Sequence, residues 1–380
     1  MSNTSQAERY LKNNSAYLEW LRTTVRGKVL FFLTPRLRTL YADYTGEKSV
    51  VQKARDCADI LNAIDENIVW RQALKLLIAW ENIRVVQQQN GYRHKTIDNS
   101  PAHAKDYYSV AVIVKNEARY IREFILFYKA TGADRIYIYD NDSSDNLIEE
   151  ITPFLETGFV VYRYLHGPVV QTFAYRDAVR RTKRRTKWLA LVDADEFLFS
   201  LKGTMPEQLK AYEKYPGVGV NWVVFGPSGH ETRPEGLVMD NYTETFADNN
   251  DINLHIKSVV QPAEVFCVRH THYALYNGRK YAVNEKGEVI DNYCALVGGA
   301  GKAFTECNNR DVFRINHYFT RSLEDLKEKC SRGFADGADK KSFDEAKKSF
   351  EVPMTEDYSI MPYADIVREE YNDSFPKSFM

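Results

Sequence analysis

The feature that most constrains the fold of this chain is an apolar run that leads directly into an acidic cluster. Leu189 to Val192 are four consecutive apolar residues, and Asp193, Asp195 and Glu196 follow them closely. A continuous apolar run of this kind is typical of a strand that is buried on both faces of a parallel sheet. Open α/β sheets bind their ligands at the carboxyl edge of such strands. We therefore predict a ligand site where this strand ends.

Asp193 and Asp195 form an Asp-x-Asp (DXD) motif, so both carboxylates can approach one divalent cation. A hard cation such as Mg²⁺ takes carboxylates, waters and substrate phosphates as its ligands. The same spacing also occurs where the first aspartate caps a helix and the second is solvated. The motif alone leaves both interpretations open.

Strand and helix patterns alternate in the segment that precedes this run. The predicted strands are residues 108–114, 135–139, 159–164 and 188–192, and the predicted helices are residues 117–131, 146–156 and 172–183. Repeated β-α-β units of this size form a parallel sheet with helices on both faces. We therefore predict an α/β, Rossmann-like fold for this part of the chain.

Polar side chains follow the ends of the first two predicted strands. They are, in chain order, Lys115, Asn116, Glu117, Asp140 and Asp145. Because the carboxyl ends of parallel strands meet at one edge of a sheet, these side chains are expected to contact a ligand together with Asp193. The last four also fit ordinary roles in turns and at helix N-termini.

The sequence lacks the common backbone cradles for phosphate groups. It contains neither a G-x-G-x-x-G fingerprint nor a G-x-x-x-x-G-K-[ST] loop. The charge of a bound diphosphate must then be neutralised by other groups. We predict that a divalent cation at Asp193 and Asp195 serves this purpose, together with Arg176 from the preceding helix.

Composition excludes several classes of protein. The 380 residues carry a formal net charge of −1, so whole-molecule attraction to nucleic acid or to an anionic membrane is not expected. The basic cluster at residues 180–187 is typical of a solvated helix end, and it lacks the interleaved aromatic residues of a nucleic-acid site. The five cysteines are scattered, and neither a signal-peptide core nor a membrane-spanning run is seen, which predicts a cytoplasmic location.

Changes in pattern divide the chain into three parts. We predict a helical N-terminal extension at residues 1–105 and the α/β domain at residues 106–338. We predict that residues 339–380 form a tail that packs on the domain, with a helix followed by an irregular segment. Residues 281–290 predict a hairpin that turns at Lys286 and Gly287. Within the extension, residues 25–38 mix an apolar core with four basic residues. That composition fits peripheral contact with the inner face of a membrane as well as ordinary helix packing.

Seven segments carry a resemblance to a known family. They are residues 115–124, 138–145, 188–197, 221–230, 257–262, 315–322 and 329–336. Taken together and in this order, they resemble glycosyltransferase family 92 and its family-2-like bacterial relatives, which have the GT-A fold. One departure is Pro227, where the family usually has a small hydroxyl residue, and this difference bears on acceptor choice.

The resemblance implies a metal-dependent, inverting glycosyltransferase with Mn²⁺ or Mg²⁺ as cofactor. The donor would be a nucleotide-diphosphate sugar, with a UDP-sugar expected, and the acceptor a hydroxyl of a glycan or glycolipid. Residues 106–200 would form the nucleotide-sugar half and residues 201–338 the acceptor half. By analogy with bacterial relatives, the product would belong to surface polysaccharide or lipopolysaccharide assembly. The alternatives are a nucleotide-sugar-binding protein without activity, a retaining transferase on the same fold, and a nucleotidyltransferase.

The resemblance also implies roles for individual residues in donor and metal binding. Asp195 is expected as the direct metal ligand and His317 as the residue that completes the metal site. Asp193 would reach the metal or the donor ribose, and Glu196 would orient its neighbours. The expected donor-binding set is Lys115, Asn116, Glu117, Asp140, Asp145, Arg176 and Asp193.

Inverting transfer needs a general base near the acceptor hydroxyl. The candidate bases are Glu231, Glu235 and Asp336, each of which also fits a solvated loop carboxylate. The acceptor is expected to contact Trp222, Ser228, His230 and His272. The two histidines also fit polar packing.

Overall fold

The computed structural model describes residues 96–103, 105–247, 250–291, 303–332 and 342–374. All of these except Asp291 belong to one compact unit of the chain. Three sequence predictions lie outside the described residues: nearly all of the N-terminal extension, the segment 25–38 within it, and the candidate base Asp336.

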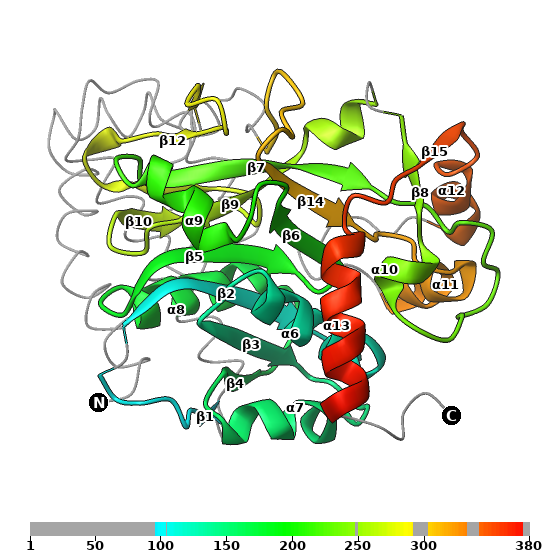
Figure 1. Cartoon of the computed structure of the whole chain (residues 1–380), viewed down its shortest axis with the longest axis horizontal. Helices are drawn as coiled ribbons and strands as arrows, with labels where there is room; N and C mark the ends of the chain where they lie inside the picture. The colour runs from blue at the N-terminus through cyan, green and yellow to red at the C-terminus, as the bar shows by residue number, and fades with distance from the viewer. Residues whose placement is uncertain (1–95, 104, 248–249, 292–302, 333–341, 375–380) are drawn as a thin grey trace, which may run out of the picture. The chain divides into compact units, whose positions relative to one another are not determined.

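A mixed sheet runs through the middle of the molecule (Figure 1). Its strand order is β1 (Thr96–Ile97), β4 (Val160–Leu165), β3 (Arg135–Asn141), β2 (Asp106–Val114), β5 (Thr186–Asp193), β9 (Ile256–Val260), β7 (Gly217–Val224), β12 (Ala282–Val283) and β13 (Val289–Ile290). The four strands from β4 to β5 are parallel to one another, whereas β9 is antiparallel to β5 and β7. The predicted α/β fold with a mostly parallel central sheet is confirmed.

Helices cover both faces of the parallel part, as predicted. They are α6 (Ala118–Ala130), α7 (Leu147–Glu156) and α8 (Gln171–Thr182). Ile138 of β3 belongs to the apolar core that also contains Phe127 of α6. The next residue, Tyr139, points to the opposite face, where its hydroxyl donates to Asp177 of α8 at 3.1 Å.

Glycine ends the first of these helices. Gly132 has φ +94°, and a Cβ at this position would lie 2.9 Å from Cδ of Pro206. Only glycine adopts such a conformation freely, so the chain can leave α6 and turn into β3 here. The prediction that this helix ends near Gly132 is confirmed.

A strand that was not predicted follows the acidic cluster. β6 (Glu196–Ser200) begins directly after the Asp193–Asp195 turn and pairs antiparallel with β14 (Phe313–His317), and β14 pairs in parallel with β7. Glu196 is the register partner of His317. This pairing brings a histidine from late in the chain to the end of β5.

Shorter elements complete the second half. The helices are α9 (Met205–Leu209), α10 (Val238–Asn241) and α11 (Leu323–Arg332), with 3-10 turns at Lys210–Tyr212, Asp251–Leu254 and Asn277–Arg279. The small strands are β8 (Glu244–Phe246), β10 (Val265–Val268) and β11 (Ala274–Tyr276). The predicted hairpin is present as β12 and β13, with Gly287 at φ +80° in its turn.

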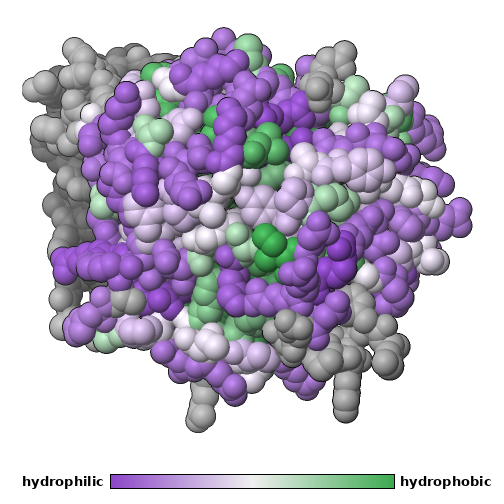
Figure 2. Space-filling view, viewed as in Figure 1, coloured by the Kyte–Doolittle hydropathy of each residue, from purple (hydrophilic) through white to green (hydrophobic). Residues whose placement is uncertain are grey.

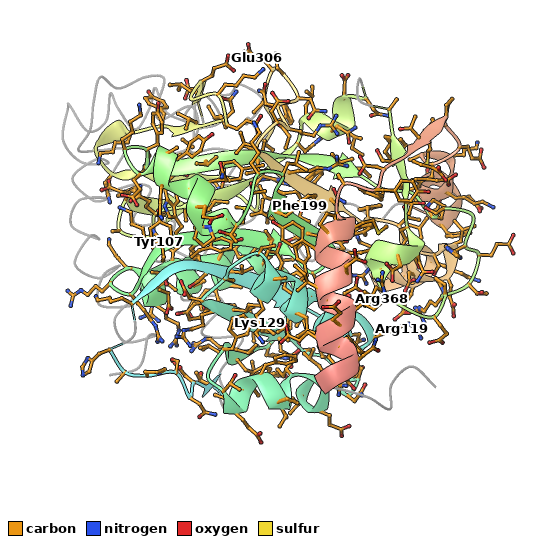
Figure 3. The ribbon with its side chains drawn as sticks, in the orientation of Figure 1. Tyr107, Arg119, Lys129, Phe199, Glu306 and Arg368 are labelled. Atoms are coloured by element: carbon orange, nitrogen blue, oxygen red, sulfur yellow. The ribbon has the colours of Figure 1, made fainter. Side chains whose placement is uncertain are left out.

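The C-terminal segment is more regular than the sequence predicted. It forms α12 (Phe343–Lys348), then β15 (Met354–Glu356), which pairs with β8, and then α13 (Met361–Ser374). The expected irregular end is therefore wrong for residues 361–374. Helix α13 runs along α6 (Figure 1). The ring of Phe199, labelled in Figure 3, lies 5.5 Å from the ring of Tyr363 of α13.

The face seen in Figure 2 is mostly hydrophilic, with small separate apolar patches. Among the described residues, no helix combines the length and the apolar character needed to cross a membrane.

Candidate active site

A cavity of about 600 Å³ lies at the carboxyl ends of the parallel strands; we call it the first cavity. It is bounded by the end of β2, the segments after β3 and β4, the β5–β6 turn and the end of β14. Seven of the predicted site residues line it: Lys115, Glu117, Asp193, Asp195, Trp222, His272 and His317. The first cavity therefore lies at the sheet edge where a ligand was predicted.

Asp193 is held by three side chains. Its Oδ1 accepts hydrogen bonds from Tyr175 at 2.7 Å and from Gln171 at 2.5 Å, both on α8. Its Oδ2 lies 2.8 Å from Nζ of Lys257, which is almost completely buried on β9. These contacts fix the orientation of the carboxylate, which stays partly exposed at the cavity wall.

Asp195 faces a different pair of groups. Its Oδ2 accepts a hydrogen bond from Nζ of Lys329 at 2.5 Å, and its Oδ1 lies 3.5 Å from Nε2 of His317. Although burial opposes its ionisation, Lys329 and His317 hold the pKa of the Asp195 carboxyl well below its usual range. Asp195 is therefore an anion at the wall of the first cavity.

The predicted metal ligands are only partly brought together. Among the described residues, no group of three or more histidine, cysteine or acidic side chains is arranged to hold a metal ion. Asp193, predicted as a ligand, is instead engaged by Lys257, Tyr175 and Gln171. Asp195 and His317 do face each other.

These two residues fit a divalent cation that takes its remaining ligands from substrate and water. Burial lowers the pKa of His317, which favours the neutral imidazole that can coordinate a metal. The residues lining the first cavity include four carboxylates and only two lysines. Two of these carboxylates, Asp193 and Glu117, pair with Lys257 and Arg321, which lie outside the cavity wall.

Lys257 and Glu196 form a buried polar pair beneath the β5–β6 turn. Lys257 Nζ lies 3.5 Å from Glu196 Oε2, and that oxygen also accepts the backbone N–H of Asp193 at 2.8 Å. Burial, together with Asp193 and Asp195, raises the pKa of Glu196 well above its usual range despite Lys257. Glu196 thus orients the turn through its hydrogen bond from the backbone N–H of Asp193. Lys257 had no predicted role, although a lysine within the mostly apolar run 256–260 was the available signal.

Three predicted donor ligands instead stabilise turns and helix ends. Asp140 is buried and accepts hydrogen bonds from Ser143 N at 2.9 Å and Tyr162 OH at 2.7 Å. Asp145 accepts the backbone N–H of Ala118 at 2.9 Å. Asn116, at φ +56°, accepts the backbone N–H of Ser144 at 2.8 Å. For these three residues the turn and capping interpretation fits the contacts.

The next loop residue, Asp142, lines the first cavity in place of Asp140. It accepts hydrogen bonds from Gly167 N at 2.9 Å and lies 2.8 Å from Nδ1 of His166. Burial alone would raise the pKa of Asp142, but the contacts with Gly167, Tyr164 and His166 lower it overall. Sequence reasoning missed it because strand β3 extends to Asn141, two residues beyond its predicted end.

Arg176 is placed differently from the prediction. Its Nε donates to the backbone carbonyl of Val268 at 2.8 Å, and it does not line the first cavity. The cations that do line it are Lys115 and Lys329. The helix α8 turns Arg176 toward β10, so the proposed contact between Arg176 and a diphosphate is not supported.

The predicted acceptor residues separate into two groups. The ring of Trp222 lies 4.3 Å from that of His317 and 5.1 Å from that of His272, and all three line the first cavity. Ser228 instead accepts the backbone N–H groups of Thr243 and Glu244, each at 3.0 Å. His230 Nε2 lies 3.1 Å from the carbonyl oxygen of Asn241. Ser228 and His230 hold a loop and do not line the first cavity.

The two described candidate bases, Glu231 and Glu235, lie away from the first cavity. Glu235 is exposed and lies 3.6 Å from Arg119, and the backbone carbonyl of Glu231 accepts the N–H of Glu324. Neither side chain lines the first cavity.

Comparison with known proteins places the chain in a family. The model of glycosyltransferase family 92 matches residues 107–332. A family 92 protein of Oryza sativa subsp. japonica is 28% identical over 190 residues, which cover 48% of this chain and 32% of that protein. A family 92 protein of Ricinus communis is 24% identical over 194 residues, which cover 48% of this chain and 34% of that protein. The matched segment thus spans about a third of the length of these relatives.

Solved glycosyltransferase structures show weaker likeness. Staphylococcus aureus TarS 1–349 in complex with UDP aligns with a TM-score of 0.32 and 12% identity, covering 72% of each chain. The mannosyltransferase PcManGT from Pyrobaculum calidifontis, in complex with GDP-Man and Mn²⁺, aligns with a TM-score of 0.23 and 15% identity, covering 44% of this chain and 47% of that chain. The family match, in contrast, includes β2 to α11 and more than half of the residues, and on that basis the chain belongs to glycosyltransferase family 92.

Proposed function

We propose that this protein transfers a sugar from a nucleotide-diphosphate donor, a UDP-sugar, to a hydroxyl group of a glycan or glycolipid, with inversion at the anomeric carbon. The observation that carries the proposal is the contact set of Asp195, which joins His317 and Lys329 at the wall of the first cavity. It supports the proposal because one anion, one imidazole and one ammonium would face the leaving diphosphate.

The chain's own residues prepare the first cavity for the donor. Lys329 and Lys115 line it and would contact the phosphate oxygens as charge develops on them. Asp193, fixed by Lys257, would accept hydrogen bonds from the ribose hydroxyls without reorientation. A Mn²⁺ or Mg²⁺ ion held by Asp195 and His317 would supply Lewis-acid stabilisation of the leaving diphosphate.

Inversion also requires a group that takes the proton of the acceptor hydroxyl. Glu117 lines the first cavity at the start of α6, with its Oε2 2.8 Å from Nη1 of Arg321. Asp195, the neighbouring carboxylate, is already engaged by Lys329 and His317. We therefore assign the base to Glu117 in place of Glu231 and Glu235. The proposed context is surface polysaccharide or lipopolysaccharide assembly at the cytoplasmic side of the membrane, and it is carried by the motif resemblance alone.

Calorimetric titration tests the donor site. UDP, GDP and CDP are titrated into the full chain with and without Mn²⁺, beside Asp195→Ala and the exposed control Asp365→Ala. We expect Mn²⁺-dependent binding of UDP that is lost only in Asp195→Ala. If none of the nucleotides binds the folded protein, the donor site is wrong. UDP-sugars are then screened for UDP release, and binding without release would favour the nucleotide-sugar-binding alternative.

A further inference from the structure

A second cavity adjoins the first. Its volume is about 340 Å³, and it lies between the first turn of α6, residues 144–146, residues 318–321 and helix α11. It shares four wall residues with the first cavity: Glu117, Asp195, Phe319 and Lys329. A ligand in the second cavity would therefore meet a ligand in the first at the groups proposed to perform the transfer.

Three cations of the second cavity pair with carboxylates of its own wall. Arg321 Nη1 lies 2.8 Å from Glu117, and Lys329 Nζ lies 2.5 Å from Asp195. Arg233 Nε lies 2.7 Å from Asp325. The wall of this cavity carries five carboxylates and four cations, so it offers little to a phosphate or another anion. It presents alternating donors and acceptors, which suit a neutral ligand with several hydroxyl groups.

Aromatic rings and polar atoms complete the wall. The Tyr120 ring lies 3.9 Å from the guanidinium carbon of Arg321, and the Tyr120 hydroxyl donates to Asp325 at 3.0 Å. Among the described residues, Thr320 Oγ1 and Arg321 Nε are buried and have no hydrogen-bond partner. Polar atoms of this kind are usually satisfied by water or a ligand.

Two residues of the wall have strained backbones. Arg321 has φ +50° and Asn116 has φ +56°, and both line the second cavity. Side-chain-bearing residues avoid this region, and strain of this kind is concentrated at functional sites. The conformation of Arg321 presents its guanidinium to both Glu117 and Tyr120.

We propose that the second cavity binds the acceptor, and that the acceptor presents a neutral sugar residue there. The assignment rests on the proposed transfer function. It replaces Ser228 and His230 as acceptor residues with Tyr120, Arg233 and Arg321, which line this cavity. A volume near 340 Å³ is at the small end of ligand sites, which are roughly 300–1,000 Å³, and fits a short terminal portion of a glycan.

Saturation-transfer NMR on the full chain tests the assignment. The probes are neutral methyl glycosides of glucose, galactose and mannose, and the charged comparators are methyl glucuronide and glucose 6-phosphate. Each is measured with and without UDP and Mn²⁺. The variants are Ser144→Trp and Asn146→Trp, which introduce bulk at exposed residues of the second cavity. Pro168→Trp introduces the same bulk at the first cavity only, and UDP affinity is measured for each variant.

We expect neutral glycosides to bind, the charged comparators to bind more weakly, and Ser144→Trp and Asn146→Trp to weaken glycoside binding about tenfold. UDP affinity in these two variants should stay within about twofold, because Ser144 and Asn146 do not line the first cavity. Pro168→Trp should show the reverse pattern. If charged sugars bind as well as neutral ones, or if the two variants leave glycoside binding unchanged, the assignment is wrong.

The two proposals fail separately. Binding of UDP without binding of any neutral glycoside would overturn the acceptor assignment and leave the donor site standing. Loss of glycoside binding in Ser144→Trp in a protein that binds no nucleotide would support the second cavity as a sugar site and remove the transfer function.

Discussion

The ammonium of Lys257 on β9 lies 2.8 Å from the carboxylate of Asp193 at the end of β5. Both strands are central in the sheet, and Lys257 is only 1% exposed. The carboxylate predicted to bind metal is thus neutralised by the protein itself, and Asp193 and Asp195 have different partners although one residue separates them.

The Lys257→Met variant should lose stability. It removes the buried cation that faces Asp193 and the fully buried Glu196, and removing one partner of a buried pair costs about 3 kcal/mol. The measurement is denaturant unfolding at pH 7. As a matched control, Lys280→Met breaks an exposed pair with Glu264 and should change the unfolding free energy by less than about 0.5 kcal/mol. Equal stability of the two variants would contradict this account of the site.

Lys329→Met should bind Mn²⁺ more tightly. In the wild type the Lys329 ammonium lies 2.5 Å from Asp195 and competes with a cation for that oxygen. We expect about a tenfold gain in affinity, which corresponds to about 1.4 kcal/mol, in titrations of Mn²⁺ alone followed by electron paramagnetic resonance. Lys327→Met, at an exposed position on the same helix, should leave Mn²⁺ affinity unchanged. Weaker Mn²⁺ binding in Lys329→Met would argue against competition at Asp195.

Tyr363→Ala should weaken the attachment of α13. The Tyr363 ring lies 5.7 Å from Phe127 and 5.5 Å from Phe199, and its hydroxyl donates to the carbonyl oxygens of Ser200 and Gly203. Removing these contacts should lower the unfolding free energy by about 2 kcal/mol, and Tyr363→Phe by about 1 kcal/mol. Tyr358→Ala, at a residue that is 52% exposed, serves as the control and should stay within about 0.5 kcal/mol. If Tyr363→Ala lowers the unfolding free energy no more than Tyr358→Ala does, the packing of α13 contributes little to the stability of the domain.

Glu123 should make stability depend on pH. Burial raises the pKa of Glu123 to about 7 from 4.5, although Val238 N and Met239 N donate to it. Between these values the folded state keeps a proton that the unfolded state has lost. The free energy of unfolding that protonated Glu123 contributes is fully present below pH 4.5 and is lost as the pH rises through 7. At about 1.4 kcal/mol per pH unit, the total is about 3 kcal/mol.

Unfolding of Glu123→Gln between pH 4.5 and 8 checks this contribution. The variant should lose the part of the pH dependence that Glu123 supplies, whereas Glu149→Gln, at an exposed position of α7, should retain it. Identical pH profiles for the wild type and Glu123→Gln would show that Glu123 titrates equally in the folded and unfolded states.

Local patterns predicted the parallel core well. The apolar runs and amphipathic helices between residues 108 and 192 match β2 to β5 within a few residues, because each element is defined by its own periodicity. Asp195 and His317 line one cavity, and their role as metal ligands stays a prediction. Strand β6 was missed because Glu196–Ser200 is too short to show a periodic pattern beside the acidic turn.

The partners of the site residues could not be read from local sequence. Lys257 and Lys329 meet the Asp193–Asp195 turn only through the sheet order β5–β9 and the placement of α11. Asp140 and Asp142 both lie near the end of β3, but their side chains have different partners. Which of the two lines the cavity depends on where the strand ends. Arg176 was predicted from its place on a helix, and the rotation of α8 decided its contact with Val268.

The insertion of β14 between β6 and β7 has a consequence for how the protein can be made. Residue 200, the predicted boundary between halves, ends β6, whose ladder partner is supplied by Phe313–His317. A ribosome must therefore deliver most of the domain before Asp195 can meet His317. A fragment that stops at residue 200 would expose β6 as an unpaired apolar edge, the kind of surface that promotes aggregation. The half that holds the Asp-x-Asp turn is thus not separable from the half that follows it, and the site is one of the last parts of the domain that synthesis allows to form.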